Sequence, residues 1–202
     1  MKSQNETLSG LSDSALMLRF RDGDIQAFNT LFERYVTKKK YISLLVGKPE
    51  LADEAFQETW ERIIKTKDRY EPTASFHTFF NTVLRNVIAS HYRKSANKDG
   101  LHISGDQVSD PDSQETTFDG LSANNGMETE QQSFLGQCVE LLHSAIGRLP
   151  IEQRESLLLK IDSGFGLEEI ANITKTTRET AKSRLRYGLK KLRNLVPEEC
   201  YG

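Results

Sequence analysis

The chain contains 202 residues, of which 37% are hydrophobic and 28% charged, and its formal net charge at pH 7 is −2. This length allows one large domain or two small ones. The N-terminus lacks the apolar core of a signal peptide, and no segment approaches the ~18 apolar residues of a membrane span. We therefore expect a cytoplasmic protein without membrane insertion. Cys138 and Cys200 form neither a CxxC pair nor a disulfide framework, and Cys138 is expected to be a buried structural thiol.

Hydrophobic spacing predicts a series of helices in the N-terminal half. Residues 1–12 are predicted to be a disordered tail, and two helices follow between residues 13 and 46, separated by a turn at Asp22-Gly23-Asp24. The next helix covers residues 51–66. Its outer face is acidic and bears an amide, with Asp53, Glu54, Gln57, Glu58 and Glu61. These acids exceed what the helix dipole needs for compensation, so a surface that binds a basic partner is an alternative to dipole compensation.

A basic loop and a long amphipathic helix follow. The loop contains Lys65, Lys67, Arg69 and Tyr70, and the helix is predicted over residues 76–98. Its polar side carries basic, aromatic and amide groups: His77, Asn81, Arg85, Asn86, His91, Tyr92, Arg93 and Lys94. This mixture suits single-stranded nucleic acid, in which bases stack on rings and phosphates meet cations. Aromatic residues alone are more typical of a core.

Residues 95–133 differ in composition from the segments on either side. They are rich in Asp, Glu, Gly, Ser and Asn, contain few aliphatic residues, and have a single lysine, Lys98. Such a segment cannot bury enough apolar surface to offset the entropy lost on ordering. We predict a flexible acidic linker between two helical domains.

The C-terminal part has the pattern of a helix-turn-helix. An amphipathic helix over residues 134–148 precedes Pro150, which is expected at a first helical position. A short helix around residues 167–173 is followed by a polar break and a long helix that ends before Pro197, and either Thr176 or Thr177 could cap this last helix. Two helices joined by a tight turn, the second cationic, fit a major groove.

Positive charge is concentrated in the last helix. Between residues 175 and 193 a single acid, Glu179, accompanies the bases Lys175, Arg178, Lys182, Arg184, Arg186, Lys190, Lys191 and Arg193. Cations on such a helix neutralise phosphates and release counterions. A solvated helix face is the alternative, and the helix-turn-helix context favours nucleic acid.

Several motifs occur together in a fixed order. They are Ala52-Asp53-Glu54 with Gln57-Glu58 and Trp60, then Phe76, Thr78, Phe79, Phe80 and Asn86, then Leu149-Pro150 with Gln153-Arg154, Glu168-Glu169-Ile170-Ala171 and Thr180-Ala181-Lys182-Ser183-Arg184-Leu185. In these motifs the sequence resembles the ECF (extracytoplasmic-function) group of bacterial RNA polymerase sigma factors, over residues 13–94 and 134–196. It departs from the family pattern at Phe79, Ser90, Lys175, Thr176 and Ala181; Lys175 replaces a glycine common in the turn.

The resemblance implies an all-α fold with two small helical domains joined by a flexible acidic linker. A region 2-like domain would cover residues 13–94, the linker residues 95–133, and a region 4-like helix-turn-helix domain residues 134–202. The implied partners are core RNA polymerase, through the clamp helices of its largest subunit and its flap region, and promoter DNA. Many members also bind an anti-sigma factor. No cofactor, metal or enzymatic activity is implied.

The resemblance also assigns roles to residues. Polymerase binding falls to Asp53, Glu54, Gln57 and Glu58. Binding and melting of the minus-10 promoter element falls to Lys65, Lys67, Arg69, Tyr70, His77, Asn81, Arg85, Asn86 and Arg93. Reading of the minus-35 element falls to Lys175, Thr177, Arg178, Thr180, Lys182, Ser183, Arg184 and Arg186.

Two other classes of protein compete with this interpretation. A stand-alone helix-turn-helix repressor or activator would need a sensing or dimerising N-terminal half, and this half lacks a ligand-pocket signature. A DNA-cleaving or recombining enzyme would need a nucleophile or a metal-binding carboxylate cluster. The acids of residues 51–66 lie on one helix, and the four histidines have no metal-ligand spacing.

Overall fold

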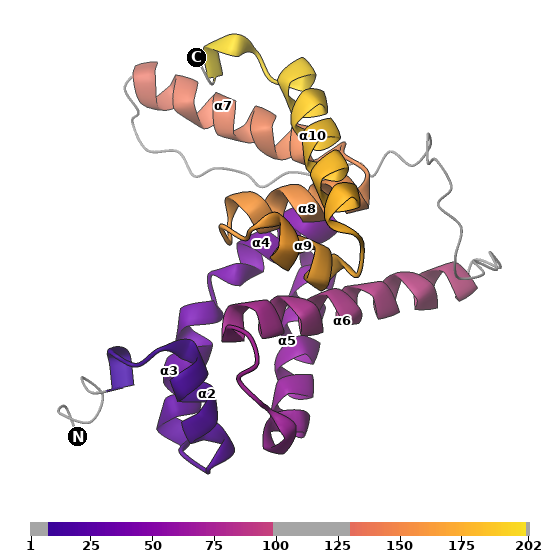
Figure 1. Ribbon diagram of the computed structural model, residues 1–202. Helices are drawn as coiled ribbons and strands as arrows, with labels where there is room; N and C mark the ends of the chain where they lie inside the picture. Colours follow the sequence, from indigo (N-terminus) through magenta and orange to yellow (C-terminus); the bar gives the residue numbers. More distant parts are fainter. Residues whose placement is uncertain (1–7, 99–129, 201–202) are drawn as a thin grey trace. The chain divides into compact units, whose positions relative to one another are not determined.

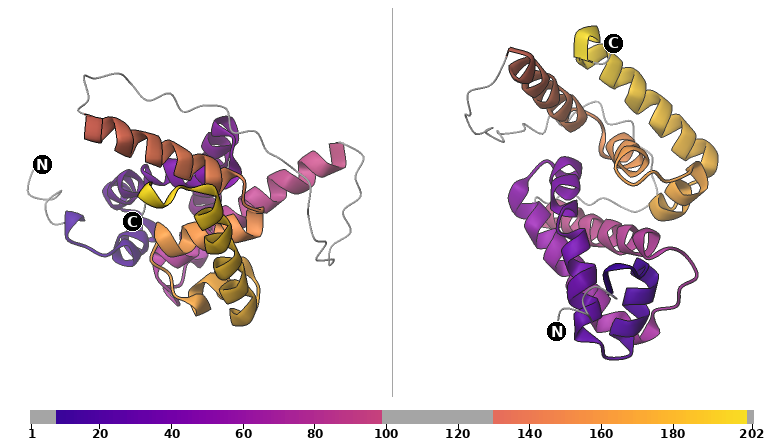
Figure 2. Two further views of the ribbon diagram at one scale, coloured as in Figure 1. Left: turned by 90° about the horizontal axis from the view of Figure 1, so that it is seen from above. Right: turned by 90° about the vertical axis from the view of Figure 1, so that its left-hand side faces the viewer.

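The computed structural model describes residues 8–98 and 130–200 (Figures 1 and 2), and residues 1–7, 99–129 and 201–202 lie outside the described part. Every regular element in the described residues is a helix, which confirms the all-α class predicted from the sequence. These residues form two compact units, each of which is considered by itself. The first contains residues 8–42 and 50–98, and the second contains residues 43–49 and 130–200.

The first unit is built from four α-helices, part of a fifth and one short 3-10 helix. They are α2 (Asp13–Arg21), α3 (Ile25–Tyr35), α4 (Lys38–Val46, divided between the units), α5 (Pro49–Thr66), η1 (Lys67–Arg69) and α6 (Phe76–Lys98). Side-chain caps start the first two: Ser12 Oγ accepts from the Ala15 N–H, and Asp24 Oδ1 accepts from the Gln26 and Ala27 N–H groups. Gly23, with φ of 102°, makes the turn that separates them.

An aromatic core holds α3, α5 and α6 together. Trp60 of α5 lies at its centre, with its ring centroid 5.3 Å from that of Phe32 and 5.6 Å from that of Phe80. Phe56, Phe76 and Phe80 are fully buried. These α6 rings therefore belong to the core rather than to a stacking platform, and their burial fixes which faces of α5 and α6 point outward.

The N-terminal boundary differs from the prediction. Leu8 is buried, and Arg34 of α3 donates hydrogen bonds to the carbonyls of Ser9 and Leu11, at 2.6 and 2.9 Å. Residues 8–12 thus belong to the folded unit rather than to a disordered tail. Composition did not reveal this because the attachment is made by backbone carbonyls, which every residue has.

The helices on either side of the linker extend into the residues predicted to form it. α6 continues through residues 95–98, and α7 begins at Glu130 rather than at Phe134. The remainder of the predicted linker, residues 99–129, lies outside the described residues. None of the helices in residues 8–98 and 130–200 combines the length and hydrophobicity required to span a bilayer.

The second unit contains the helix-turn-helix. Its elements are α7 (Glu130–Gly147), α8 (Ile151–Ile161), α9 (Leu167–Thr174), α10 (Arg178–Leu195) and η2 (Glu198–Cys200). Pro150 is the residue before α8, not its first helical residue. Of the two caps considered for α10, the structure uses Thr177, whose Oγ1 accepts from the Thr180 N–H at 3.1 Å. Glu169 closes the start of α9, where its Oε2 accepts from the Gly166 N–H.

Buried polar and close-packed contacts fix the angle between these helices. Arg154 of α8 is buried and donates from Nη2 to the carbonyl of Gly147, the last residue of α7, and to that of Leu149 in the following connection. The Gly147 carbonyl is one that the helix end leaves without an intrahelical partner. Gly188 of α10 lies over α8, so close that a Cβ atom there would be 3.6 Å from the Gln153 carbonyl oxygen.

The prediction for the cysteines is wrong. Cys138 of α7 and Cys200 of η2 form a disulfide that joins residues 62 positions apart, so Cys138 is not a free structural thiol. The chain folds η2 back toward α7 after α10 ends, as Figure 1 shows at the C-terminus. Spacing in the sequence did not indicate the pair because the bond depends on how α7 and α10 pack.

Candidate polymerase and promoter interfaces

The outer face of α5 carries exposed acids near the start of the helix. Asp53, Glu54 and Gln57 are exposed, as predicted from the apolar stripe on the opposite side. Asp53 Oδ1 accepts from Lys39 Nζ of α4 at 2.9 Å, and both side chains remain accessible to solvent. Such an exposed pair is weak and can exchange for a charge on another molecule.

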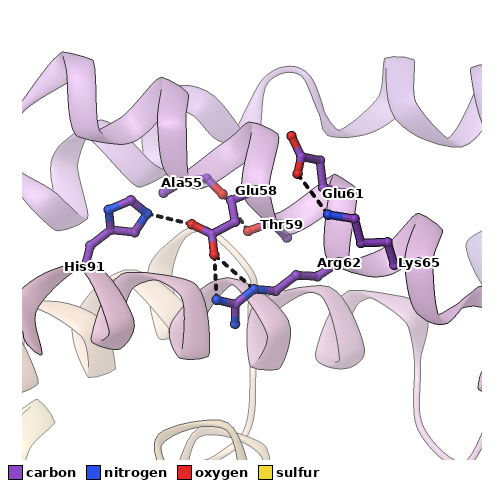
Figure 3. Close-up of polar contacts among 7 residues, drawn as sticks. All are labelled: Ala55, Glu58, Thr59, Glu61, Arg62, Lys65 and His91. Atoms are coloured by element: carbon purple, nitrogen blue, oxygen red, sulfur yellow. Dashed lines mark hydrogen bonds and ion pairs between the residues drawn. The ribbon is translucent and has the colours of Figure 1, made fainter. Parts of the chain in front are cut away.

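Glu58 differs from its acidic neighbours because both of its carboxylate oxygens are bonded within the unit. Figure 3 shows the carboxylate between the guanidinium of Arg62 and the imidazole ring of His91. Arg62 of α5 donates from Nε and Nη2 to Oε1, at 3.1 and 2.5 Å. His91 Nε2 of α6 lies 2.8 Å from Oε2. Glu58 is 28% exposed, so it fastens α5 to α6 instead of projecting from the docking face as predicted.

These partners change the acidity of Glu58. Burial favours a higher pKa, but the hydrogen bonds from Arg62 and His91 and their positive charge outweigh it. The pKa of Glu58 therefore lies below its ordinary value. Arg62 was not identified from the sequence, and His91 was grouped only with the polar residues of its helix. The i, i+4 spacing of Glu58 and Arg62 could have indicated half of the cluster.

The residues predicted to bind the minus-10 element differ in burial: some are exposed, some half-buried and two buried. Lys65, Arg69 and Arg93 are exposed, and Lys67, His77, Arg85 and Asn86 are half-buried. Lys67 Nζ donates to the Arg21 carbonyl at 3.0 Å and lies over the Phe20 ring, so it also has a structural role. Lys65 forms an exposed pair with Glu61.

Tyr70 and Asn81 correct the prediction. Both are buried, Tyr70 against the rings of Phe76 and Phe79, and Asn81 with its Nδ2 donating to the His77 carbonyl at 2.8 Å. Their side chains do not reach the surface in this conformation, so they support the loop and helix that carry the exposed cations. A polar residue on a helical wheel was expected to point outward, whereas the aromatic core extends around that side of α6.

The cationic surface of α10 is formed by residues of one face. Lys175, Arg178, Lys182 and Arg186 are exposed, while Thr180, Ser183 and Arg184 are half-buried. Arg178, Lys182 and Arg186 recur every fourth residue and therefore lie along one row. Arg178 Nε donates to Glu168 Oε1 of α9 at 2.7 Å, with the side chains 52% and 70% exposed. Glu168 was not recognised as its partner because only the folded turn brings the two helix starts together.

The turn between α9 and α10 passes through a left-handed residue. Lys175 has φ of 53° and ψ of 47°, a conformation that glycine adopts most easily. The Thr176 N–H donates to the Ala171 carbonyl at 2.9 Å, which ends α9 in the manner of a Schellman motif. The tight turn thus places Thr177 at the start of α10 without the glycine that the family pattern has at this position.

Comparisons with known families agree with this arrangement. Residues 31–98 match Sigma-70 region 2, and residues 140–192 match Sigma-70 region 4. The "ECF RNA polymerase sigma factor EcfG" of Rhodopseudomonas palustris is 31% identical over 152 residues, covering 75% of each chain. The "RNA polymerase sigma factor CarQ" of Myxococcus xanthus is 26% identical over 183 residues, covering 90% of this chain and 96% of the relative.

Solved structures share the fold. A sigma factor RpoE from Bartonella quintana, in complex with the anti-sigma factor NepR, is similar with a TM-score of 0.56 and 23% identity, covering 79% of this chain and 89% of that one. CnrH, in complex with the cytosolic domain of CnrY, has a TM-score of 0.60 and 18% identity, covering 91% and 96%. With regions 2 and 4 both present and in order, the chain belongs to the ECF group of RNA polymerase sigma factors, which bind core RNA polymerase and direct transcription initiation at promoters.

Proposed function

We propose that the first unit docks onto RNA polymerase through Asp53, Glu54 and Gln57. The observation that carries this proposal is the exposed acidic face at the start of α5, whose opposite side is buried in the aromatic core. An acidic face of this kind suits a basic partner such as a clamp coiled coil of the polymerase. Glu58 supports the face from behind by fixing α5 to α6.

The minus-10 element would be held by the segment that runs from the end of α5 through α6. Exposed Lys65, Arg69 and Arg93 would meet phosphates, and half-buried Asn86 would contact an unpaired base. Unstacking a base costs on the order of a few kcal/mol. A protein that opens DNA without nucleotide hydrolysis offsets this cost by stacking and phosphate contacts.

The minus-35 element would be read by α10. Lys175, Lys182 and Arg186 offer cations to the groove and its phosphates. Arg178 is oriented by its ion pair with Glu168. Because this pair is largely exposed, replacing Glu168 by a phosphate or a base edge as the partner of Arg178 costs little free energy. Thr180, Ser183 and Arg184 are half-buried, so they would contact DNA only where it lies close against α10.

The remaining features of the proposal follow from the family. The chain acts in the cytoplasm, where promoter DNA lies, and contributes recognition rather than catalysis. The region 2-like and region 4-like parts of the chain act as separate recognition domains, and residues 99–129 join them. The solved complex of the RpoE sigma factor with NepR supports an anti-sigma partner for this chain as well.

Run-off transcription tests the proposal. Purified core polymerase is incubated with genomic DNA fragments, with and without this protein. We expect new transcripts that start at defined positions only when both proteins are present. If no transcript forms while the protein alone shifts a discrete duplex, the proposal fails and a stand-alone repressor or activator takes its place.

A further inference from the structure

The fold brings two cysteines that are far apart in the sequence to bonding distance. The Cα atoms of Cys138 and Cys200 are 5.4 Å apart, within the range of about 4.4 to 6.8 Å that a disulfide spans. Cys138 is placed by α7. Cys200 is placed by η2, in which its N–H donates to the Pro197 carbonyl at 3.1 Å. The backbone thus presents both sulfur atoms to each other.

Little else among the described side chains fastens the N-terminal half of α7. From residue 134 to residue 142 every side chain except Cys138 is exposed, including apolar Leu135 at 60% and Val139 at 51%. The segment that carries Cys200 is also mostly exposed. Pro197, Glu198 and Glu199 are exposed, and Cys200 is half-buried. The disulfide is therefore the main side-chain connection between this half-helix and the C-terminal end of the described chain.

A disulfide of this kind is unusual for a transcription protein. Thiols are kept reduced where RNA polymerase works, and disulfides that do form there are usually transient and catalytic or redox-sensing. We propose that Cys138 and Cys200 form a reversible redox site, which low-molecular-weight disulfides oxidise, and that the bond switches the N-terminal half of α7 from a frayed to an ordered state.

The oxidation proceeds through two thiol–disulfide exchange steps. The thiolate of Cys200, the more accessible of the two, attacks one sulfur of the small disulfide RSSR and releases RS⁻. The thiolate of Cys138 then attacks the sulfur of Cys200 in this mixed disulfide, forms the protein disulfide and releases a second RS⁻. The protons of the two protein thiols end on the leaving groups, so one RSSR is reduced to two RSH.

The consequence for the helix follows from its exposure. Cys138 is the one buried side chain among residues 134–142, so without the bond local opening of this half-helix costs little free energy. With the bond, the half-helix is tied to the end of a closed loop that contains α8, α9 and α10, and opening must also distort that loop. Oxidation therefore orders a helix that carries exposed apolar side chains.

Hydrogen exchange of the full-length protein tests this inference. The protein is equilibrated in buffers of reduced or oxidised glutathione, thiols are counted by alkylation and mass spectrometry, and amide exchange is followed in peptides from residues 134–142. We expect oxidised glutathione to close the bond and to slow this exchange about 30-fold, the factor that corresponds to the lower end of the stabilisation a disulfide typically gives. Reduced glutathione should reverse both changes.

Cys200→Ser is the matched control, since it removes the bond and leaves α7 unchanged. Its exchange over residues 134–142 should be fast and equal in both buffers. Thiols that stay reduced in excess oxidised glutathione, or equal wild-type exchange in the two buffers, would overturn the inference. These measurements need neither polymerase nor promoter, so their outcome is independent of the proposed function.

Discussion

Lys175 adopts the left-handed conformation that the turn between α9 and α10 requires, and this lowers the stability of the protein. A left-handed conformation places the Cβ of any L residue other than glycine close to the neighbouring carbonyl oxygen, at a cost of about 1–2 kcal/mol. At Lys175 this conformation ends α9 and starts α10. The residue that destabilises the turn also supplies a cation beside the proposed recognition helix, so on this proposal stability is exchanged for a positive charge near the promoter.

We expect Lys175→Gly to raise the free energy of unfolding of the protein by about 1 kcal/mol, because glycine adopts the left-handed region without strain. Chemical denaturation followed by circular dichroism measures this. Lys175→Ala is the control, since it removes the same charge but keeps the Cβ atom. An equal gain from both substitutions would show that the lysine charge, not the backbone, is responsible.

Side chains that lie at the edge of the core were the hardest to place from the sequence. Helical periodicity gave the direction of Phe76 and Phe80 correctly, because their apolar neighbours repeat at the same spacing. It misplaced Asn81, which is buried although polar, and it did not apply to Tyr70, a loop residue that packs against the Phe76 ring. It also could not show that Cys200 meets Cys138, because no local pattern encodes a bond across 62 positions.

At the scale of elements, α5 and α6 act as a pair. The aromatic core joins them on one side, and Glu58 with Arg62 and His91 joins them at the surface. One helix bears the proposed polymerase surface and the other the proposed minus-10 surface. Fixing one to the other means that docking of α5 also orients α6 for the promoter.

Glu58→Gln is expected to lower the free energy of unfolding by about 1 kcal/mol at pH 7, the typical net contribution of one intramolecular hydrogen bond. The pKa of Glu58 is lowered in the folded state, so the carboxylate contributes fully above its ordinary value of 4.5. That contribution is lost as the pH falls through the lower folded pKa. Denaturation between pH 7 and pH 3 should therefore show the difference from wild type shrinking only at the acidic end.

Glu61→Gln serves as the comparison, because the Glu61–Lys65 pair also has i, i+4 spacing on α5 but is mostly exposed. Its effect should be smaller at every pH. A Glu58→Gln penalty that stays constant down to pH 3 would contradict the assignment of the ionised carboxylate as the stabilising form.

The helices themselves were largely predictable, whereas their ends were not. The periodicity of α3, α5, α6 and α10 predicted them because each has a continuous apolar stripe. The start of α10 was left open between Thr176 and Thr177, since both can accept a capping hydrogen bond and only the left-handed turn before them decides. The extension of α7 to Glu130 was missed because those residues resemble the acidic linker in composition.

For the whole molecule, a net charge of −2 conceals two surfaces of opposite sign. The first unit has exposed acids on α5, and the second has exposed bases on α10. Electrostatic complementarity contributes specificity and association rate, so one chain can present an acidic face to polymerase and a basic face to DNA. Each surface can consequently be removed without affecting the other.

We expect Asp53→Lys with Glu54→Lys to abolish association with core polymerase, because the reversed charges repel a basic docking surface. Arg178→Ala with Lys182→Ala should leave that association intact and weaken promoter binding by the holoenzyme, by about 1–3 kcal/mol for each base that the helix no longer reads. Polymerase pull-down and promoter titration at fixed salt measure the two effects separately, and circular dichroism verifies that each variant folds.

Matched substitutions distinguish these surfaces from net charge. Glu71→Lys reverses an exposed acid of the first unit outside α5, and Lys190→Ala with Lys191→Ala removes two exposed cations further along α10. The Glu71 variant should still bind polymerase, and the Lys190 and Lys191 variant should lose less promoter affinity than the Arg178 and Lys182 variant. Equal losses in variant and control would mean that bulk charge, rather than the start of α5 or α10, determines binding.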